Sequence, residues 1–222
     1  MPVNEKYLAP FENEGIYHVY NRTNNKELLF RSDANYLHFL KLYAKYISPF
    51  AGTYAWNLLP NHFHFLIKIK KEEEIARHIN TLSKPTISEQ FFLIDKNIDV
   101  LMEMEFKRFF TSYVMAVNIM FARTGNLFSR TFKRVKIDKD IQFTQALIYI
   151  HANAQKYKLV KYFEEHKWTS YHSIVSEKHT ILLRDEIIDW FGSKEEFIKT
   201  HRELIEYYYG FSGSIEDADA DE

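Results

Sequence analysis

The sequence contains no cysteine in its 222 residues. Disulfide bonds and cysteine-based zinc sites are therefore excluded, and this composition fits a cytoplasmic location. The sequence also lacks any stretch of about 18 uncharged apolar residues, which a membrane-spanning helix would need. Residues 1–6 do not show the pattern of a secretory signal peptide. We therefore expect a cytoplasmic globular protein without a membrane partner.

Net charge is also nearly absent, because 29 lysine and arginine residues are balanced by 30 aspartate and glutamate residues. The distribution is uneven. Acidic residues crowd the end of the sequence, and we expect 212–222 to be a disordered acidic tail. Between residues 123 and 136 the charged side chains are all basic and phenylalanines lie among them, as in surfaces that bind single-stranded nucleic acid. Those basic residues are Arg123, Arg130, Lys133, Arg134 and Lys136.

Two hydrophobic periodicities divide the chain into strands and helices. Alternation predicts strands at 15–24, 53–58, 62–70 and 127–137. Helical spacing and capping signals predict helices at 33–48, 71–82, 89–123 with a break near 96–97, 140–157, 184–191 and 194–209. The order is typical of an α+β, ferredoxin-like split βαβ fold, in which an antiparallel sheet carries helices on one face. The other face is then free to carry a site.

The most informative motif is the tripeptide His62-Phe63-His64 in the third predicted strand. Because side chains alternate across a strand, the two histidines share one face, and Phe63 shares the other with Phe65. Imidazoles at i and i+2 are about 7 Å apart along the chain, so two ring nitrogens can converge on one metal ion. A strand pair of histidines is by itself more often structural, and a metal site needs a further ligand.

A later predicted helix offers that ligand. Tyr149 and Asn153 are four residues apart, so they lie one above the other on one helix face. A tyrosine hydroxyl and an amide oxygen would project side by side. Tyr113 is a rival tyrosine, but Asn118 follows it by five residues and points out of phase. His151 is on another face of the helix, and we expect it to be a packed histidine.

Four motifs in this order resemble the REP-associated tyrosine transposases, which belong with the small single-tyrosine transposases of the HUH superfamily. The motifs are LPNHFH at 59–64, GNLF at 125–128, YIHAN at 149–153 and WTSY at 168–171. The resemblance implies an enzyme that cleaves and rejoins single-stranded, hairpin-forming DNA through a 5′-phosphotyrosine intermediate. We expect a transposase-like domain over 1–175, a C-terminal helical extension over 176–211 and then the acidic tail.

Carried over residue by residue, Tyr149 matches the nucleophile of this family, and His62, His64 and Asn153 match its metal ligands. The resemblance implies Mg²⁺ or Mn²⁺, whereas imidazole ligands by themselves favour zinc or nickel. The family pattern has a proline after the asparagine, and this sequence has Ala154. Proline would disfavour helical geometry at the asparagine. Alanine lets the helix continue, which affects how Asn153 presents its oxygen.

Three functions remain open on the sequence. The first is a metal-dependent DNA strand transferase with a tyrosine nucleophile. The second is an inactive or domesticated relative that binds structured single-stranded DNA. The third is a metal-dependent phosphodiesterase in which Tyr149 only packs. The expected phosphate contacts are Arg22 and the basic run at 123–136, although each residue is equally well explained as a solvated charge. A monomer and a homodimer are both compatible with the sequence.

Overall fold

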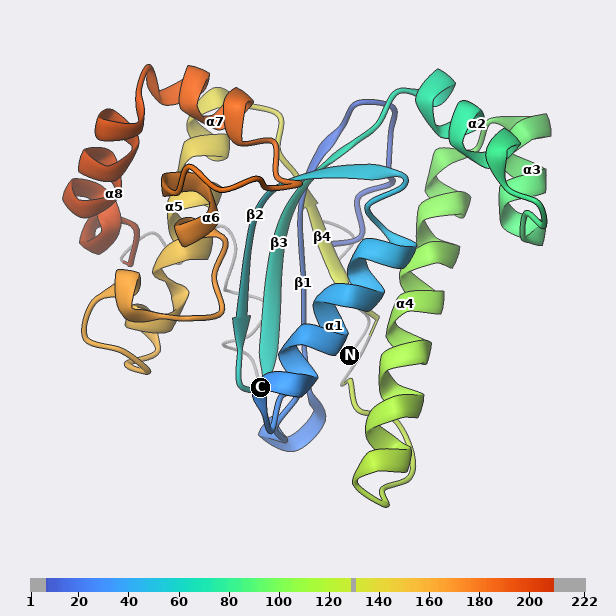
Figure 1. The fold of residues 1–222 in the computed structure, drawn as a ribbon, viewed down its shortest axis with the longest axis horizontal. Helices are drawn as coiled ribbons and strands as arrows, with labels where there is room; N and C mark the ends of the chain where they lie inside the picture. Colours follow the sequence, from blue (N-terminus) through green and yellow to red (C-terminus); the bar gives the residue numbers. More distant parts are fainter. Residues whose placement is uncertain (1–6, 129–130, 210–222) are drawn as a thin grey trace.

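The computed structural model describes residues 7–128 and 131–209. The expected acidic tail at 212–222 and Arg130 lie outside these residues. In the described part of the chain, four strands form one antiparallel sheet in the order β2-β3-β1-β4 (Figure 1). They are β1 (Ile16–Arg22), β2 (Ala51–Leu59), β3 (His62–Ile69) and β4 (Lys133–Lys136). The sheet and its helices confirm the expected ferredoxin-like α+β fold.

One face of the sheet is covered by α1 (Asp33–Tyr46) and α4 (Ile98–Met120). The phenylalanines of β3 point into this layer, as their alternation predicts. Phe65 stacks on Tyr43 of α1 with the ring centroids 4.1 Å apart, and Phe63 lies in the same buried cluster. Burial of these aromatic rings stabilises the packing of both helices on the sheet. The histidines of β3 consequently face the opposite side.

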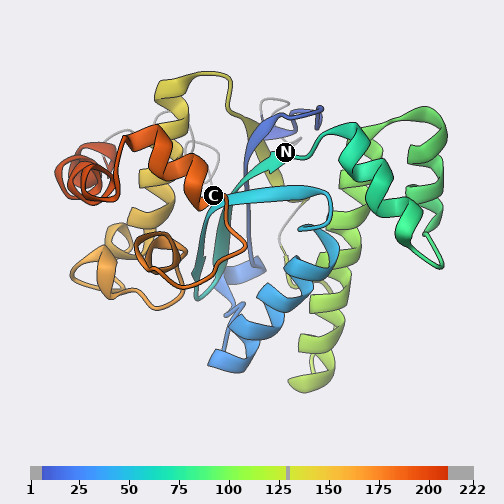
Figure 2. The same cartoon turned by 45° about the horizontal axis from the view of Figure 1, so that its top comes forward.

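The opposite face is covered by α5 (Asp140–Lys156), which packs on β2 and β3. Further helices surround α5 (Figures 1 and 2). They are α6 (Tyr171–Val175), α7 (Arg184–Phe191) and α8 (Lys194–Tyr209). The sheet therefore lies between two helical layers. The face that we expected to be free is partly closed, because α5 follows β4 and packs back onto the sheet.

Two short helices, α2 (Glu72–Thr81) and α3 (Ile87–Asp95), lie beyond the sheet beside one end of α4 (Figure 1). The break predicted near 96–97 is confirmed. Lys96 ends α3 in the left-handed conformation with a φ of 57°. Asn97 Oδ1 then accepts a hydrogen bond from the Val100 N–H and begins α4. Among the helices of the described residues, none is long and apolar enough to cross a membrane.

The strand expected at 127–137 is shorter than predicted. β4 covers only its last part, and Phe128 forms an isolated bridge with Thr23. Two 3₁₀ turns lie in the connections, η2 (Asn24–Lys26) before α1 and η3 (Phe163–Glu165) before α6. The polar turn residues Thr124, Gly125 and Asn126 separate α4 from this bridge.

Tyr113 lies on α4, on the sheet face away from the histidines, and its side chain is fully buried. Its hydroxyl donates a hydrogen bond of 2.7 Å to the Leu29 carbonyl oxygen. We expect Tyr113→Phe to lower the free energy of unfolding by about 1–3 kcal/mol, because a buried acceptor loses its donor. Urea unfolding measures the change. Tyr46→Phe, at a partly exposed tyrosine of α1, is the matched control, and equal stability of both variants would contradict the prediction.

Candidate active site

The two histidines of β3 lie on the sheet face that α5 covers. Their ring centroids are 5.3 Å apart, and the ring planes are nearly perpendicular. His64 is 4% exposed, whereas His62 is half-buried at the start of the strand. The side-chain oxygen of Asn61 lies 2.7 Å from His62 Nδ1 and orients that ring. β3 therefore presents two imidazoles on one face, at the end of the strand nearest its turn to β2.

A third histidine, His18 of β1, lies beside this pair. Its Nε2 is 2.9 Å from His64 Nδ1, and the two rings are stacked. Burial lowers the pKa of His18 to about 3. Burial, with a smaller contribution from His18, also lowers the pKa of His64 well below its usual value. Both imidazoles are therefore neutral at pH 7. His64 Nε2 is buried and has no hydrogen-bond partner among the described residues.

Tyr149 lies on the side of α5 that faces the sheet. Its ring is 5.7 Å from the His64 ring and 6.0 Å from the His18 ring, and it is steeply inclined to both. Asn153 is fully buried one turn further along, and its Nδ2 donates a 2.9 Å hydrogen bond to the Tyr149 carbonyl oxygen. Asn153 Oδ1 has no hydrogen-bond partner in the described part of the chain. The structure therefore brings Tyr149 to His64 and leaves the amide oxygen of Asn153, on the same helix, without a hydrogen bond from the described residues.

Asn57 of β2 ties α5 to the sheet at this point. It is the register partner of His64 in the β2–β3 hairpin, and its Nδ2 donates a 2.6 Å hydrogen bond to the Ile150 carbonyl oxygen. The residue next to Tyr149 is thereby anchored to the strand next to His64. Neither Asn57 nor His18 belongs to a sequence motif, because the strand register that places them depends on the whole sheet.

A series of hydrogen bonds ties α5 to α8 as well. His201 Nδ1 is 2.8 Å from the Phe197 carbonyl oxygen, and His201 Nε2 is 2.9 Å from His151 Nδ1. His151 Nε2 is 2.9 Å from Ser170 Oγ, which accepts the Trp56 N–H. Because a carbonyl oxygen can only accept, His201 donates through Nδ1, His151 donates to His201, and Ser170 donates to His151. His151 is therefore a packed, fully hydrogen-bonded histidine, as expected.

The burial of His151 and His201 makes the fold sensitive to acid. Burial lowers the pKa of His201 to about 3, whereas the unfolded side chain has a pKa of about 6.5. Between these values unfolding takes up a proton, so stability falls as the pH falls. We expect His201 to contribute a loss of about 1.4 kcal/mol in the free energy of unfolding per pH unit below about pH 6. Urea unfolding at pH 7.5 and 5.0 measures it, and an unchanged pH difference in His201→Gln would contradict it.

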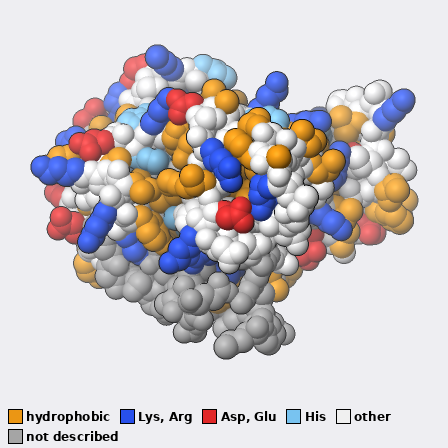
Figure 3. All heavy atoms as spheres, turned by 90° about the horizontal axis from the view of Figure 1, so that it is seen from below, with side chains coloured by type: hydrophobic (Ala, Val, Ile, Leu, Met, Phe, Trp, Pro, Cys, Tyr) orange, Lys and Arg blue, Asp and Glu red, His pale blue; other side chains and the backbone are white. Residues whose placement is uncertain are grey.

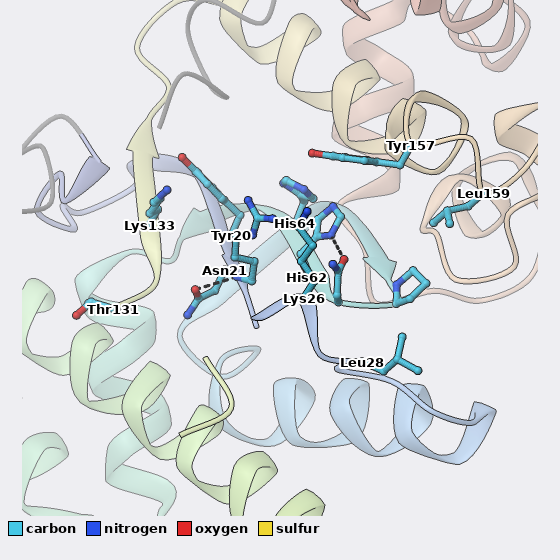
Figure 4. Close-up of a pocket in the computed structure, with 13 residues that line it drawn as sticks. Tyr20, Asn21, Lys26, Leu28, His62, His64, Thr131, Lys133, Tyr157 and Leu159 are labelled. Atoms are coloured by element: carbon cyan, nitrogen blue, oxygen red, sulfur yellow. Dashed lines mark hydrogen bonds between the residues drawn. The ribbon is translucent and has the colours of Figure 1, made fainter. Parts of the chain in front are cut away.

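A cavity of about 390 Å³ opens beside His62 and His64 (Figure 4). Tyr157 and Leu159 stand on one side of the histidines, and Lys133 stands on the other (Figure 4). Seen from below in the orientation of Figure 1, the surface shows histidine and apolar side chains among lysine and arginine side chains (Figure 3). The size of the cavity suits a small ligand or one unit of a polymer.

Of the predicted basic residues that the structure describes, two line this cavity: Arg22 at the end of β1 and Lys133 at the start of β4. Lys26 of the turn η2 also lines it, and no sequence pattern predicts this residue, because the turn determines its position. Lys133 Nζ lies 5.7 Å from the centroid of the Tyr20 ring, and the Tyr20 ring in turn stacks on the His64 ring. Cationic side chains and aromatic rings therefore share one cavity wall.

The other described basic residues of the run do not line the cavity. Arg134 is 3% exposed and directs its guanidinium to Glu103 of α4 at 2.6 Å. Lys136 and Arg123 are also paired with carboxylates elsewhere. Neighbouring side chains of a strand point to opposite sheet faces. Lys133 and Arg134 are therefore on different faces, and the run at 123–136 is divided instead of forming one surface.

Among solved structures, this chain is similar to a REP-associated tyrosine transposase bound to a REP hairpin. The TM-score is 0.51 over 78% of this chain and 87% of that chain, and 15% of the aligned residues are identical. The two chains share a fold. No protein-family model and no curated protein matches the sequence. The structural likeness confirms the fold that the four sequence motifs imply.

The donor atoms beside His62 and His64 determine whether a divalent metal could bind there. Among the described residues, no group of three or more histidine, cysteine or carboxylate side chains could hold a metal ion. A site built on His62 and His64 therefore needs a ligand of another kind. The buried Asn153 Oδ1 is a suitable oxygen donor, and the buried His64 Nε2 is a suitable nitrogen donor. The donor set fits a metal that accepts both imidazole and amide oxygen.

Proposed function

We propose that this protein cleaves and rejoins single-stranded DNA with Tyr149 as the nucleophile. The observation that carries the proposal is the position of Tyr149, whose ring is 5.7 Å from the His64 ring, in a fold shared with a tyrosine transposase. That transposase is bound to a REP hairpin, which supports a hairpin-forming strand as the substrate. The cations of the adjacent cavity suit a phosphate backbone.

In the proposed reaction, Tyr149 Oη loses its proton and bonds to the scissile phosphorus, while the bond from phosphorus to the 3′ oxygen breaks. The 3′ oxygen takes up a proton and leaves as a 3′-hydroxyl, and the 5′-phosphate stays on the tyrosine. One phosphodiester replaces another, so a 3′-hydroxyl can reverse the step. This balance suits strand transfer better than hydrolysis. A tyrosine hydroxyl with a pKa of about 10 is a weak nucleophile at neutral pH, and it needs accurate positioning.

We propose His62, His64 and Asn153 as the ligands of Mg²⁺ or Mn²⁺. When bound, such an ion supplies Lewis-acid polarisation of the phosphate. His64 would bind through Nε2, because its Nδ1 lies against His18 Nε2. In that arrangement His64 donates its Nδ1–H to His18, and the hydrogen bond holds the ligand ring in one orientation. Asn57 holds Tyr149 at this site through the backbone of α5.

The test is a hairpin DNA with a single-stranded tail, incubated with the protein and Mg²⁺ or Mn²⁺ and separated on a denaturing gel. The strand carries different labels at its two ends. The 3′ label is expected to move with the protein as a covalent adduct, and the 5′ label to move as a shortened strand with a free 3′-hydroxyl. A set of hairpins with different tails covers different recognition sequences. Binding without either product would contradict the proposal.

One observation favours a second candidate, a phosphodiesterase that uses water. Tyr149 is only 7% exposed and does not line the cavity beside His62, so a water molecule has easier access than the phenol. In this alternative Tyr149 packs against His18 and His64. Cleavage of the strand into two free labelled fragments, without a covalent adduct and at an equal rate in Tyr149→Phe, would favour the phosphodiesterase over the strand transferase.

A further inference from the structure

The end of α5 carries a tyrosine that the four sequence motifs do not include. The helix continues through Ala154, as alanine allows, and Tyr157 is its C-cap. The Lys158 N–H bonds to the Gln155 carbonyl oxygen, and the Leu159 N–H bonds to the Ala154 carbonyl oxygen. With Lys158 in the left-handed conformation at a φ of 57°, these bonds form a Schellman cap. The backbone that carries Tyr157 and Leu159 is therefore held in a defined turn.

Tyr157 stands at the mouth of the cavity. Its ring centroid is 4.9 Å from that of His62, and its side chain is 47% exposed. Leu159, 46% exposed, continues the same wall, and Lys133 lies across the cavity (Figure 4). A half-exposed aromatic ring beside an apolar side chain and opposite a cation offers both a stacking surface and a phosphate contact.

We propose that this cavity binds one nucleotide next to the scissile phosphate, with its base stacked on Tyr157 and a phosphate near Lys133 and Arg22. The inference rests on the proposed function and extends it to a binding subsite. A volume of about 390 Å³ suits a single nucleotide. Stacking uses the face that every base has, so the subsite orders the strand without selecting a sequence.

Tyr157 acts here as a positioning residue, and its ring matters more than its hydroxyl. Tyr157→Phe keeps the ring and should retain DNA affinity and adduct formation. Tyr157→Ala removes the ring and should weaken binding of the tailed hairpin by about 5- to 100-fold. Tyr162→Ala is the matched control, because Tyr162 is 52% exposed, lies five residues away and does not line the cavity.

The experiment measures fluorescence anisotropy of the tailed hairpin in the presence of EDTA, so that binding is separated from cleavage. An abasic residue is placed at each tail position in turn, with the hairpin holding the register. At one position the wild-type protein should lose the same 5- to 100-fold in affinity. The affinity of Tyr157→Ala should not change when the abasic residue is at that position, because the stacking partner is already missing.

Three results would overturn the subsite: wild-type affinity in Tyr157→Ala, losses that multiply when variant and abasic residue are combined, or loss of the adduct in Tyr157→Phe. The last would indicate that Tyr157 is itself a nucleophile. The abasic series on the wild-type protein needs no variant, so it stands even where a variant folds poorly. The affinities of the wild-type protein and Tyr157→Ala for intact and abasic DNA form a binding cycle, which is independent of the adduct assay. A protein that shows the cycle and never cleaves would reject the proposed function and keep the subsite.

Discussion

Tyr149→Phe is expected to abolish the covalent protein–DNA adduct, with a fall in the rate of strand cleavage of about a thousandfold or more. The substitution removes the only protein atom that forms a bond to phosphorus in the proposed reaction. Loss of the nucleophile lowers the rate by at least that factor in other enzymes that act through a covalent intermediate. The aromatic ring stays packed against His18 and His64, so the packing of α5 is preserved. Adduct on a denaturing gel, followed with the 3′ label, is the measurement.

Tyr162→Phe is the matched control for this variant, because it removes one tyrosine hydroxyl at an exposed position away from the cavity. It should form adduct at the wild-type rate. The affinity of Tyr149→Phe for the tailed hairpin should also stay within about twofold of wild type, since phosphate contacts supply most of the binding. Adduct that persists in Tyr149→Phe would assign the chemistry to another tyrosine, which tryptic mapping of the phosphopeptide would then identify.

His64→Ala is expected to lose metal-dependent cleavage to a similar extent, by about a thousandfold. It removes Nε2, the proposed ligand atom, and also the ring against which Tyr149 packs. His18 loses its hydrogen-bond partner, so we expect an added cost of about 1–3 kcal/mol in the free energy of unfolding. Binding of the hairpin should survive and remain sensitive to salt. Cleavage at the wild-type rate would exclude His64 as a ligand.

Metal binding can be separated from catalysis in the same protein. Ligands that bind only the folded state raise the melting temperature, so Mn²⁺ should stabilise the wild-type protein without DNA. His64→Ala and Asn153→Ala should lose this shift, whereas His38→Ala, on α1 at the opposite face of the sheet, should keep it. A shift that is retained in both ligand variants would place the metal elsewhere, whatever the outcome of the cleavage assay.

Much of the fold follows from local pattern. The alternation in β3 correctly predicted that Phe65 and the histidines point to opposite faces, because a strand has no other way to arrange neighbouring side chains. The helix break at Lys96 was equally predictable, since Asn97 is a good N-cap. Each of these features depends on interactions within a few residues.

The rest of the site depends on pairing between distant segments. His18 meets His64 only because β1 and β3 pair in one register, and Asn57 reaches α5 only because that helix crosses the sheet. The basic run is divided for the same reason. Its residues look continuous along the sequence, but the pleat of β4 sends Arg134 into the core and Lys133 into the cavity. One-dimensional spacing does not contain that information.

The series of hydrogen bonds from Phe197 to Trp56 runs in a single direction, because each member gives one proton and receives one. Shortening the protein before α8 would leave a buried imidazole donor without an acceptor and would strip the apolar cover from the helix that holds Tyr149. The helix α8 is therefore part of the support for Tyr149 and not an accessory. We expect a protein trimmed back to the sheet and its first helices to lose the packing that holds α5 in place.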